Sequence, residues 1–341
     1  EADLRAKLEM DPEWADIIEV CGSQWKLMEA GYLDFVDPSL VPLLAEMPLE
    51  WLLYYPFWYD NKLYGIVIEW GQSSLVYRID KFEELGLYEK YPQYFNGTQL
   101  VDPAFLFDPI PELEGKIWWY DSCTELPERE AIYYLTGERV HSAAELVEWT
   151  LVPEKWEQLE QVFYGLRPKI GKFFTGVEEA YEALQTGEAV AVWCWNDMYA
   201  AGALGPDWEP GTGDEAPVGW FISPVPGSWA TAYCINSRLR ETKGFDLWVA
   251  AHAFLNAVSA PEAHATKISE WFYGAPNRYA WDLAKQWWEE WGEGYGAVLE
   301  EVLAETRVSD VRYMAVECAY WMEIPDEIVR PWEEFWLEYK A

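Results

Sequence analysis

Aromatic and polar side chains meet in the segment Trp193-Cys194-Trp195-Asn196-Asp197, which directly follows the apolar run Ala189-Val190-Ala191-Val192. Tryptophan faces attract cations, and the chain as a whole carries a large excess of negative charge. Residues of these types favour binding of a small cationic molecule at this point of the chain.

The elements around this segment would place it at the end of a strand. Residues 177–188 are typical of an amphipathic helix with a glycine stop at Gly187, and a short buried strand follows. In open α/β sheets, ligands lie outside the carboxyl ends of the strands. The sequence therefore predicts a ligand pocket walled by tryptophan at the end of this strand.

Short strands and helices alternate along the rest of the chain. This alternation predicts an α/β architecture with mainly parallel sheets. The expected strands are 15–20, 66–68, 74–77, 115–120, 219–222 and 228–235, and the expected helices are 2–10, 80–88, 153–163, 245–256 and 263–271.

The charge balance excludes several classes of partner. The chain has 60 acidic and 24 basic residues among 341, a net charge of −36, whereas nucleic-acid binding needs clustered Lys and Arg. No run of about 18 apolar residues predicts a membrane span. The chain begins at Glu1 without a signal peptide, so we expect that a signal was removed or lies upstream.

Sequence motifs for catalysis or metal binding do not occur. The five cysteines form no CxxC pair, the three histidines are scattered, and HExxH, P-loop and GxSxG motifs are missing. No catalytic residue, metal ligand or cofactor is predicted. A glycosidase that uses two carboxylates remains a remote alternative, because no motif proposes such a pair.

Four segments, in this order, resemble the periplasmic binding proteins of bacterial ABC importers for spermidine and putrescine. The segments are Asn61-Lys62-Leu63-Tyr64-Gly65 with Glu69-Trp70-Gly71 and Leu75-Val76-Tyr77; Gly187-Glu188-Ala189 with Trp195-Asn196; Pro226-Gly227-Ser228-Trp229 with Tyr233-Cys234-Ile235; and Tyr273-Gly274-Ala275-Pro276-Asn277.

The resemblance implies a two-lobed periplasmic-binding-protein fold of type II. Each lobe would be a mixed sheet flanked by helices, and two strands would form the hinge. Lobe 1 would comprise residues 1–78 and 228–281, and lobe 2 residues 79–227 and 282–341. The opening strand of the family has no counterpart here, so we expect it upstream of Glu1.

The resemblance also implies which residues bind the ligand in a cleft between the lobes. Trp195, Trp229 and Tyr273 would form aromatic walls, and Asp121 and Glu125 would face the amines. The remaining candidates are Asn196 beside Trp195, Glu69 and Trp70 at the hinge, and Ser23, Gln24 and Trp25 in an early turn.

One departure from the family concerns specificity. The family has an aspartate two residues after the tryptophan that matches Trp229, and this chain has Thr231 there. Glu69 could replace the lost amine partner. Relatives in this superfamily bind 4-aminobutyrate, and Arg278 would be the donor for the carboxylate of such a zwitterion.

The function that the resemblance implies is capture of a polyamine by the substrate-binding component of an ABC importer. The protein would be a monomer, periplasmic or tethered outside the cell by a lipid, and would deliver its ligand to permease subunits. The alternatives on the same scaffold are 4-aminobutyrate, a betaine-like amine or a sugar.

Overall fold

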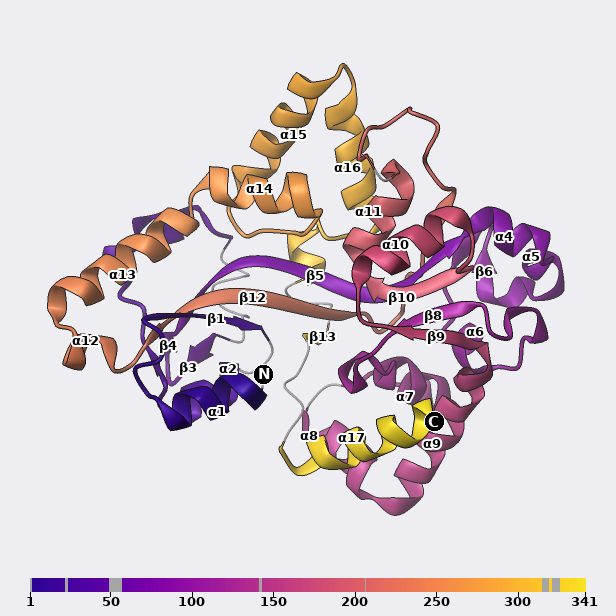
Figure 1. Cartoon of the computed structure of the whole chain (residues 1–341), viewed down its shortest axis with the longest axis horizontal. Helices are drawn as coiled ribbons and strands as arrows, with labels where there is room; N and C mark the ends of the chain where they lie inside the picture. The colour runs from indigo at the N-terminus through magenta and orange to yellow at the C-terminus, as the bar shows by residue number, and fades with distance from the viewer. Residues whose placement is uncertain are drawn as a thin grey trace. The chain divides into compact units, whose positions relative to one another are not determined.

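The computed structural model describes residues 2–21, 24–48, 57–140, 143–205, 207–314, 319–320 and 326–341. Contacts divide the chain, whose helices and strands are labelled in Figure 1, into two compact units. Unit 1 comprises Glu1–Gly71 and Ser228–Glu323, and unit 2 comprises Gln72–Gly227 and Ile324–Ala341. No helix in the described part of the chain is both long and apolar enough to cross a membrane.

The sheet of unit 1 is built on β12 (Gly227–Asn236). β1 (Ile17–Cys21) and β2 (Leu33–Asp34) pair with β12 in antiparallel register, and the first part of β5 (Gly65–Arg78) is its other neighbour. Alternate residues of β1 face the core, because side chains in a strand point to opposite faces in turn. The helices of this unit are α1 (Ala2–Met10), α2 (Gln24–Glu29), α12 (Leu239–Thr242), α13 (Phe245–Val258), α14 (Pro261–Trp271), α15 (Ala280–Trp291) and α16 (Tyr295–Glu305).

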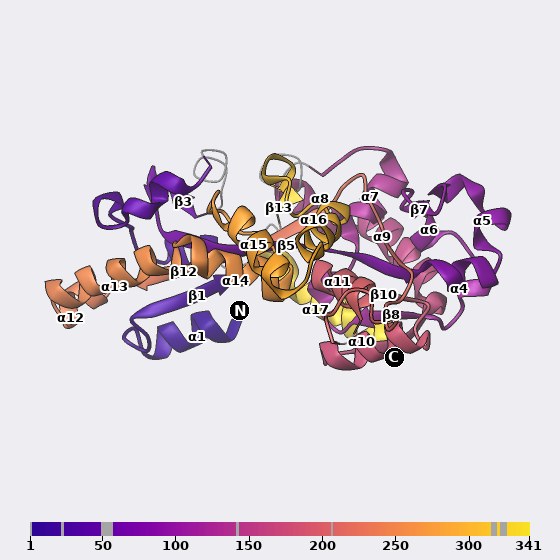
Figure 2. The same cartoon turned by 90° about the horizontal axis from the view of Figure 1, so that it is seen from above.

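The helices α14 and α15 lie side by side in both views of the molecule (Figures 1 and 2). The buried Trp288 of α15 donates from its indole nitrogen to the carbonyl of Ser269 at 3.1 Å and meets Phe272 edge to face. This packing joins α15 to α14 within unit 1, whereas the expected division assigned residues from 282 onward to lobe 2.

The sheet of unit 2 has the order β5-β10-β8-β9, with β10 (Ala191–Trp195), β8 (Ile117–Tyr120) and β9 (Ile170–Phe174). These last three strands are parallel to one another, while β5 is antiparallel to β10 and to β11 (Val218–Trp220). Parallel neighbours need a crossover, which helices supply between β8, β9 and β10. The expectation of mainly parallel sheets is therefore wrong, and the mixed sheet is confirmed.

Further elements complete the described chain. The helices of unit 2 are α4 (Ile79–Glu84), α5 (Leu87–Lys90), α6 (Ala104–Phe107), α7 (Glu128–Thr136), α8 (Ala143–Leu151), α9 (Pro153–Leu166), α10 (Val177–Thr186), α11 (Asn196–Leu204) and α17 (Asp326–Lys340). The short strands are β3 (Trp58–Tyr59), β4 (Lys62–Leu63), β6 (Phe95–Asn96), β7 (Gln99–Leu100) and β13 (Ala319–Tyr320).

Two expected strands, 66–68 and 74–77, are in fact one. β5 runs unbroken over 14 residues, and every one of them is buried. Glu69-Trp70-Gly71 continues the strand because both edges of β5 find partners: β12 beside its first part, and β10 and β11 beside its second. The expected helix 80–88 is divided in turn, because Gly86 adopts a left-handed φ of 69° between α4 and α5.

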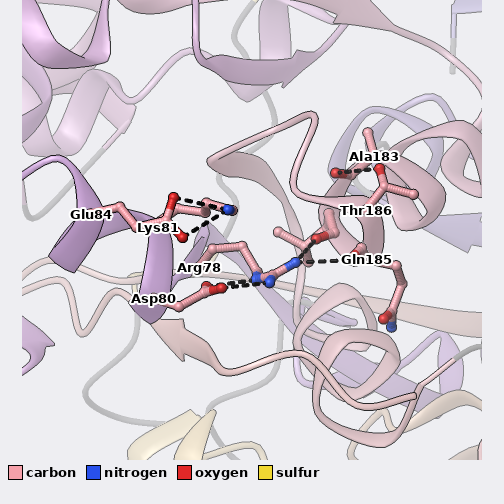
Figure 3. Close-up of polar contacts among 8 residues, drawn as sticks. Arg78, Asp80, Lys81, Glu84, Ala183, Gln185 and Thr186 are labelled. Carbon is pink, nitrogen blue, oxygen red and sulfur yellow. Dashed lines mark hydrogen bonds and ion pairs between the residues drawn. The ribbon is translucent and has the colours of Figure 1, made fainter. Parts of the chain in front are cut away.

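The predicted order of helix, glycine stop and strand around residue 187 is confirmed. Gly187 ends α10 with a left-handed φ of 74°. Arg78, at the end of β5, donates from Nη1 to the last carbonyls of α10, those of Leu184 and Gln185, at 2.8 Å each, and pairs with Asp80 at 2.7 Å (Figure 3). The buried guanidinium thereby caps the C-terminal end of α10, the helix that precedes β10.

Candidate functional site

Glu125 lies in a buried position of unit 2, on the 3₁₀ turn Cys123–Glu125 that follows β8. The residue is only 3% exposed. Trp193 Nε1 donates to the carboxyl Oε2 at 3.2 Å, and Trp119 Nε1 donates to the backbone carbonyl of Glu125 at 3.0 Å. A carboxyl group buried among indoles is therefore the centre of this candidate site.

The two indoles are held by the sheet itself. Trp119 on β8 and Trp193 on β10 are register partners, so their side chains leave the same face of the sheet at the same height. Their rings stack with centroids 4.6 Å apart and planes 7° from parallel. The stack places both N–H groups on one residue, Glu125.

Burial changes the protonation of Glu125. Loss of water raises the pKa of its carboxyl to about 8, and hydrogen bonding to Ser73, Trp193 and Trp195 opposes this rise only in part. The carboxyl is therefore mostly neutral at pH 7 when nothing positive lies beside it. A cation that entered the site would favour the ionised form.

Two further acids lie near the start of α7: Glu130, which is buried, and Glu128, which is half-buried. The Ser223 hydroxyl donates to Glu130 at 2.7 Å, and burial raises the pKa of Glu130 to about 7. Burial also raises the pKa of Glu128, against the opposing effect of Arg129, whose Nε lies 3.8 Å from the Glu128 carboxylate. Sequence reasoning missed these residues, because acids in the first turn of a helix are ordinarily solvated.

Trp195 and Asn196 occupy the carboxyl end of β10, as expected. Trp195 is half-buried, and its ring centroid lies 4.9 Å from that of Tyr120 on the neighbouring strand. Asn196 is buried and accepts a hydrogen bond from the backbone of Gln72 at 3.0 Å. Asp197 accepts from the Tyr181 hydroxyl at 2.6 Å, so its charge is used within the unit.

Asp121, the other predicted amine-binding acid of this unit, already has a cationic partner. Lys340 Nζ and Trp336 Nε1, both from α17, donate to its Oδ1 at 2.6 Å and 2.9 Å. Both members of the ion pair are about one quarter exposed. Asp121 and Glu125 thus differ in their partners: Asp121 forms an ion pair with Lys340, whereas Glu125 is a buried acid that accepts a hydrogen bond from an indole.

The aromatic candidates of unit 1 form a pair of their own. Trp229 on β12 meets Tyr273 edge to face, with ring centroids 4.7 Å apart. Trp229 Nε1 is buried and has no hydrogen-bond partner in the described residues. An unsatisfied indole N–H beside a tyrosine can donate a hydrogen bond to an acceptor atom of a ligand. Thr231, two residues along β12, is buried and opposes Cys21 of β1.

Glu69 and Trp70 serve the interior of unit 1 in this structure. Glu69 pairs with Lys267 at 2.7 Å. The Trp70 indole is fully buried and donates to the carbonyl of Val308 at 2.9 Å. A Cβ at Gly274 would lie 1.9 Å from Trp70 Nε1, so the glycine of the Tyr273-Gly274-Ala275-Pro276-Asn277 segment is what admits this ring. Trp70 thus offers no exposed surface to a ligand.

Three candidates from the early turn can be placed only in part. Ser23 lies outside the described residues, while Gln24 and Trp25 open helix α2. Arg278, the expected carboxylate donor of a zwitterion, lies in unit 1. Its guanidinium donates to the backbone carbonyls of Ala45 and Glu46, at 2.8 Å each, and is thereby used within unit 1.

The chain is similar to known proteins in its fold and not in its sequence. Neither a protein-family model nor a curated protein sequence matches the chain. Solved structures do match over its whole length. The spermidine/putrescine ABC transporter substrate-binding protein PotD of Streptococcus pneumoniae is 15% identical with a TM-score of 0.68, and the match covers 99% of this chain and 87% of that one.

Two other similar structures were solved as receptors for different ligands. MotA from A. tumefaciens B6, in complex with glucopine, is 16% identical with a TM-score of 0.61 over 100% of this chain and 88% of that one. The Atu4243 GABA receptor is 15% identical with a TM-score of 0.60 over 100% and 85%. The chain therefore has the fold of the two-lobed periplasmic solute-binding proteins.

Proposed function

We propose that this protein is the substrate-binding component of an ABC importer and that it captures a small cationic amine. The observation that carries the proposal is the buried carboxyl of Glu125, bonded by Trp193 and adjoined by Trp195. The fold supports the transport role, since the solved structures that match include a spermidine/putrescine ABC transporter substrate-binding protein, a PBP in complex with glucopine and a GABA receptor. Binding, rather than catalysis, is the proposed activity.

The physical chemistry of Glu125 suits an alkyl ammonium group. A desolvated ammonium needs a carboxylate, and its arrival makes ionisation of the buried carboxyl favourable. Tryptophan faces add cation–π attraction of ~0.5–2 kcal/mol each when desolvated. They also cover methylene groups, at about 0.8 kcal/mol per buried CH₂.

Other parts of the proposal follow from the resemblance. Trp229 and Tyr273 of unit 1 would take part in binding, with the free indole donor of Trp229 meeting a polar atom of the ligand. Closure of one lobe on the other around the ligand stays a prediction. So do delivery to permease subunits, a monomeric state and a location outside the cytoplasm, in the periplasm or on a lipid anchor.

Calorimetric titration tests this proposal. Putrescine, spermidine and 4-aminobutyrate are titrated into the wild-type protein, into Trp195→Ala and into Trp291→Ala, whose exposed indole on α15 makes it the matched control. We expect micromolar binding of at least one amine, about −8 kcal/mol, lost in Trp195→Ala and kept in Trp291→Ala. No heat with any of the three would reject the proposed ligand class.

A second readout uses the protonation of Glu125. Because its pKa is about 8 in the empty site, binding of an ammonium at pH 7 should release up to one proton. The apparent binding enthalpy then varies with the ionisation enthalpy of the buffer. Glu125→Gln should abolish this dependence as well as weaken binding.

A further inference from the structure

The carboxylate of Asp121 is held by a cation from the far end of the chain. Lys340 Nζ lies 2.6 Å from Asp121 Oδ1, although the two residues are 219 positions apart. The same oxygen accepts from Trp336 Nε1 at 2.9 Å. One charge-assisted hydrogen bond and one indole donor therefore satisfy this oxygen from α17.

The helix that brings Lys340 is firmly seated in unit 2. Arg167 donates from Nε to the carbonyl of Tyr339 at 2.8 Å and from Nη2 to that of Lys340 at 3.3 Å. The buried Trp332 donates to the Thr150 hydroxyl at 3.0 Å. Arginine on the last carbonyls caps this helix, as its dipole favours. Lys340 is thus held at a fixed place beside Asp121.

Asp121 belongs to the same end of the sheet as Glu125 and Trp195. It directly follows Tyr120, whose ring lies 4.9 Å from that of Trp195. Asp121 directly follows β8, and Glu125 ends the 3₁₀ turn Cys123–Glu125 that comes next, so both acids lie on the same segment at this end of the sheet. Two acids are therefore near the proposed ligand position. Asp121 forms an ion pair with Lys340, whereas Glu125 forms none with a lysine or arginine of the described residues.

The other predicted positions do not supply a second unpaired carboxylate either. Within unit 1, Glu69 is paired with Lys267 at 2.7 Å, and position 231 carries a threonine. Among the predicted ligand acids in the described chain, only Glu125 has no lysine or arginine within ion-pair distance. A diamine would leave one ammonium without a carboxylate, which is costly once that group is desolvated.

We propose that Lys340 is a specificity-determining residue. Its ammonium forms an ion pair with the Asp121 carboxylate, so that this carboxylate is not available to a ligand. The site therefore binds ligands with one cationic group and disfavours diamines. This inference rests on the proposed function and narrows its ligand class. Lys340 acts as a built-in competitor for the second ammonium, and discrimination arises because displacing it costs the ion pair. The favoured ligand is an amine whose other end is neutral or negative.

A pair of matched ligands tests the inference. Putrescine and 4-amino-1-butanol have the same four-carbon chain and differ only in the second ammonium, which is a hydroxyl in the alcohol. We expect the wild-type protein to bind 4-amino-1-butanol at least as tightly as putrescine. Lys340→Gln should tighten putrescine binding about tenfold relative to the alcohol, and Lys340→Met should do the same.

Three controls separate this effect from a general change of charge. Lys90→Gln removes an equal charge from unit 2, where Lys90 pairs with Glu112 at 2.8 Å, and should leave the ratio of the two affinities unchanged. Lys340→Arg should keep the wild-type ratio. Adding Asp121→Asn to Lys340→Gln should erase the gain, because the freed carboxylate is what binds the second ammonium.

The outcomes distinguish this inference from the proposed function. If amines bind the wild-type protein but the ratio is the same in Lys340→Gln, the role of Lys340 is overturned and amine capture stands. A wild-type preference for putrescine that Asp121→Asn removes would overturn it as well. If no amine binds the wild-type protein or any variant, amine capture itself is rejected, and the inference with it.

Discussion

Two pairs of aromatic rings, one in each unit, are used in opposite ways. In unit 2, Trp119 and Trp193 stack in parallel and both donate their N–H groups to Glu125. In unit 1, Trp229 and Tyr273 meet edge to face, and the Trp229 N–H is buried without a partner in the described residues. The two pairs therefore differ in whether the indole N–H has a partner within its own unit.

The largest effect should come from removing a ring of the stacked pair. Trp193→Ala deletes a side chain that is 3% exposed and takes away the donor to Glu125. We expect the free energy of unfolding to fall by about 3–5 kcal/mol, measured by urea denaturation. Trp291→Ala, on an exposed indole, is the control and should change it by less than about 0.5 kcal/mol.

The protonation of Glu125 gives the next largest effect. Its pKa is about 8 in the folded protein and about 4.5 when unfolded, so its contribution is complete below pH 4.5 and is lost as pH rises through 8. Stability should decline across this window by roughly 2–4 kcal/mol from this group. Glu125→Gln should remove that part of the decline in denaturation curves taken at successive pH values.

Glu130 provides a matched variant for the pH series. Its pKa of about 7 means that Glu130→Gln should flatten the decline between pH 4.5 and 7 but leave the part near pH 8. If the two variants gave the same curve as the wild-type protein, the decline would arise from the overall negative charge instead.

Replacing one tryptophan of each aromatic pair by phenylalanine should have a smaller effect on stability, but it compares the two indole N–H groups most directly. Trp193→Phe keeps a ring but removes one of the hydrogen-bond donors to Glu125, and should cost about 1–3 kcal/mol of stability. Trp229→Phe removes a donor that has no partner, so stability should stay the same or rise, while affinity for the ligand falls. Equal losses of stability in both variants would show that the two N–H groups do not differ.

The sequence predicted the local features of unit 2 well. The helix, the left-handed Gly187 and the strand ending at Trp195 are all local, because capping, periodicity and apolar runs act over a few residues. The order of four short motifs was enough to predict the fold that the solved structures share.

Features set by distant partners could not be predicted. Nothing near Asp121 in the sequence indicates that Lys340 neutralises it from 219 residues away. Trp70 sits in a segment typical of the hinge, yet its burial depends on Gly274 and Val308. Glu130 has the sequence context of a solvated first turn, and only the fold shows that Ser223 and the surrounding core enclose it.

The return of α17 to unit 2 has a consequence for how the chain is synthesised. Unit 2 begins at Gln72, but its last piece, Ile324–Ala341, emerges from the ribosome only after all of unit 1 has been made. Until then Phe163 lacks its contacts with Trp332 and Phe335, and Asp121 has no lysine. Since domains fold as units during synthesis, unit 1 can complete its core first, and unit 2 stays unfinished until the final helix arrives.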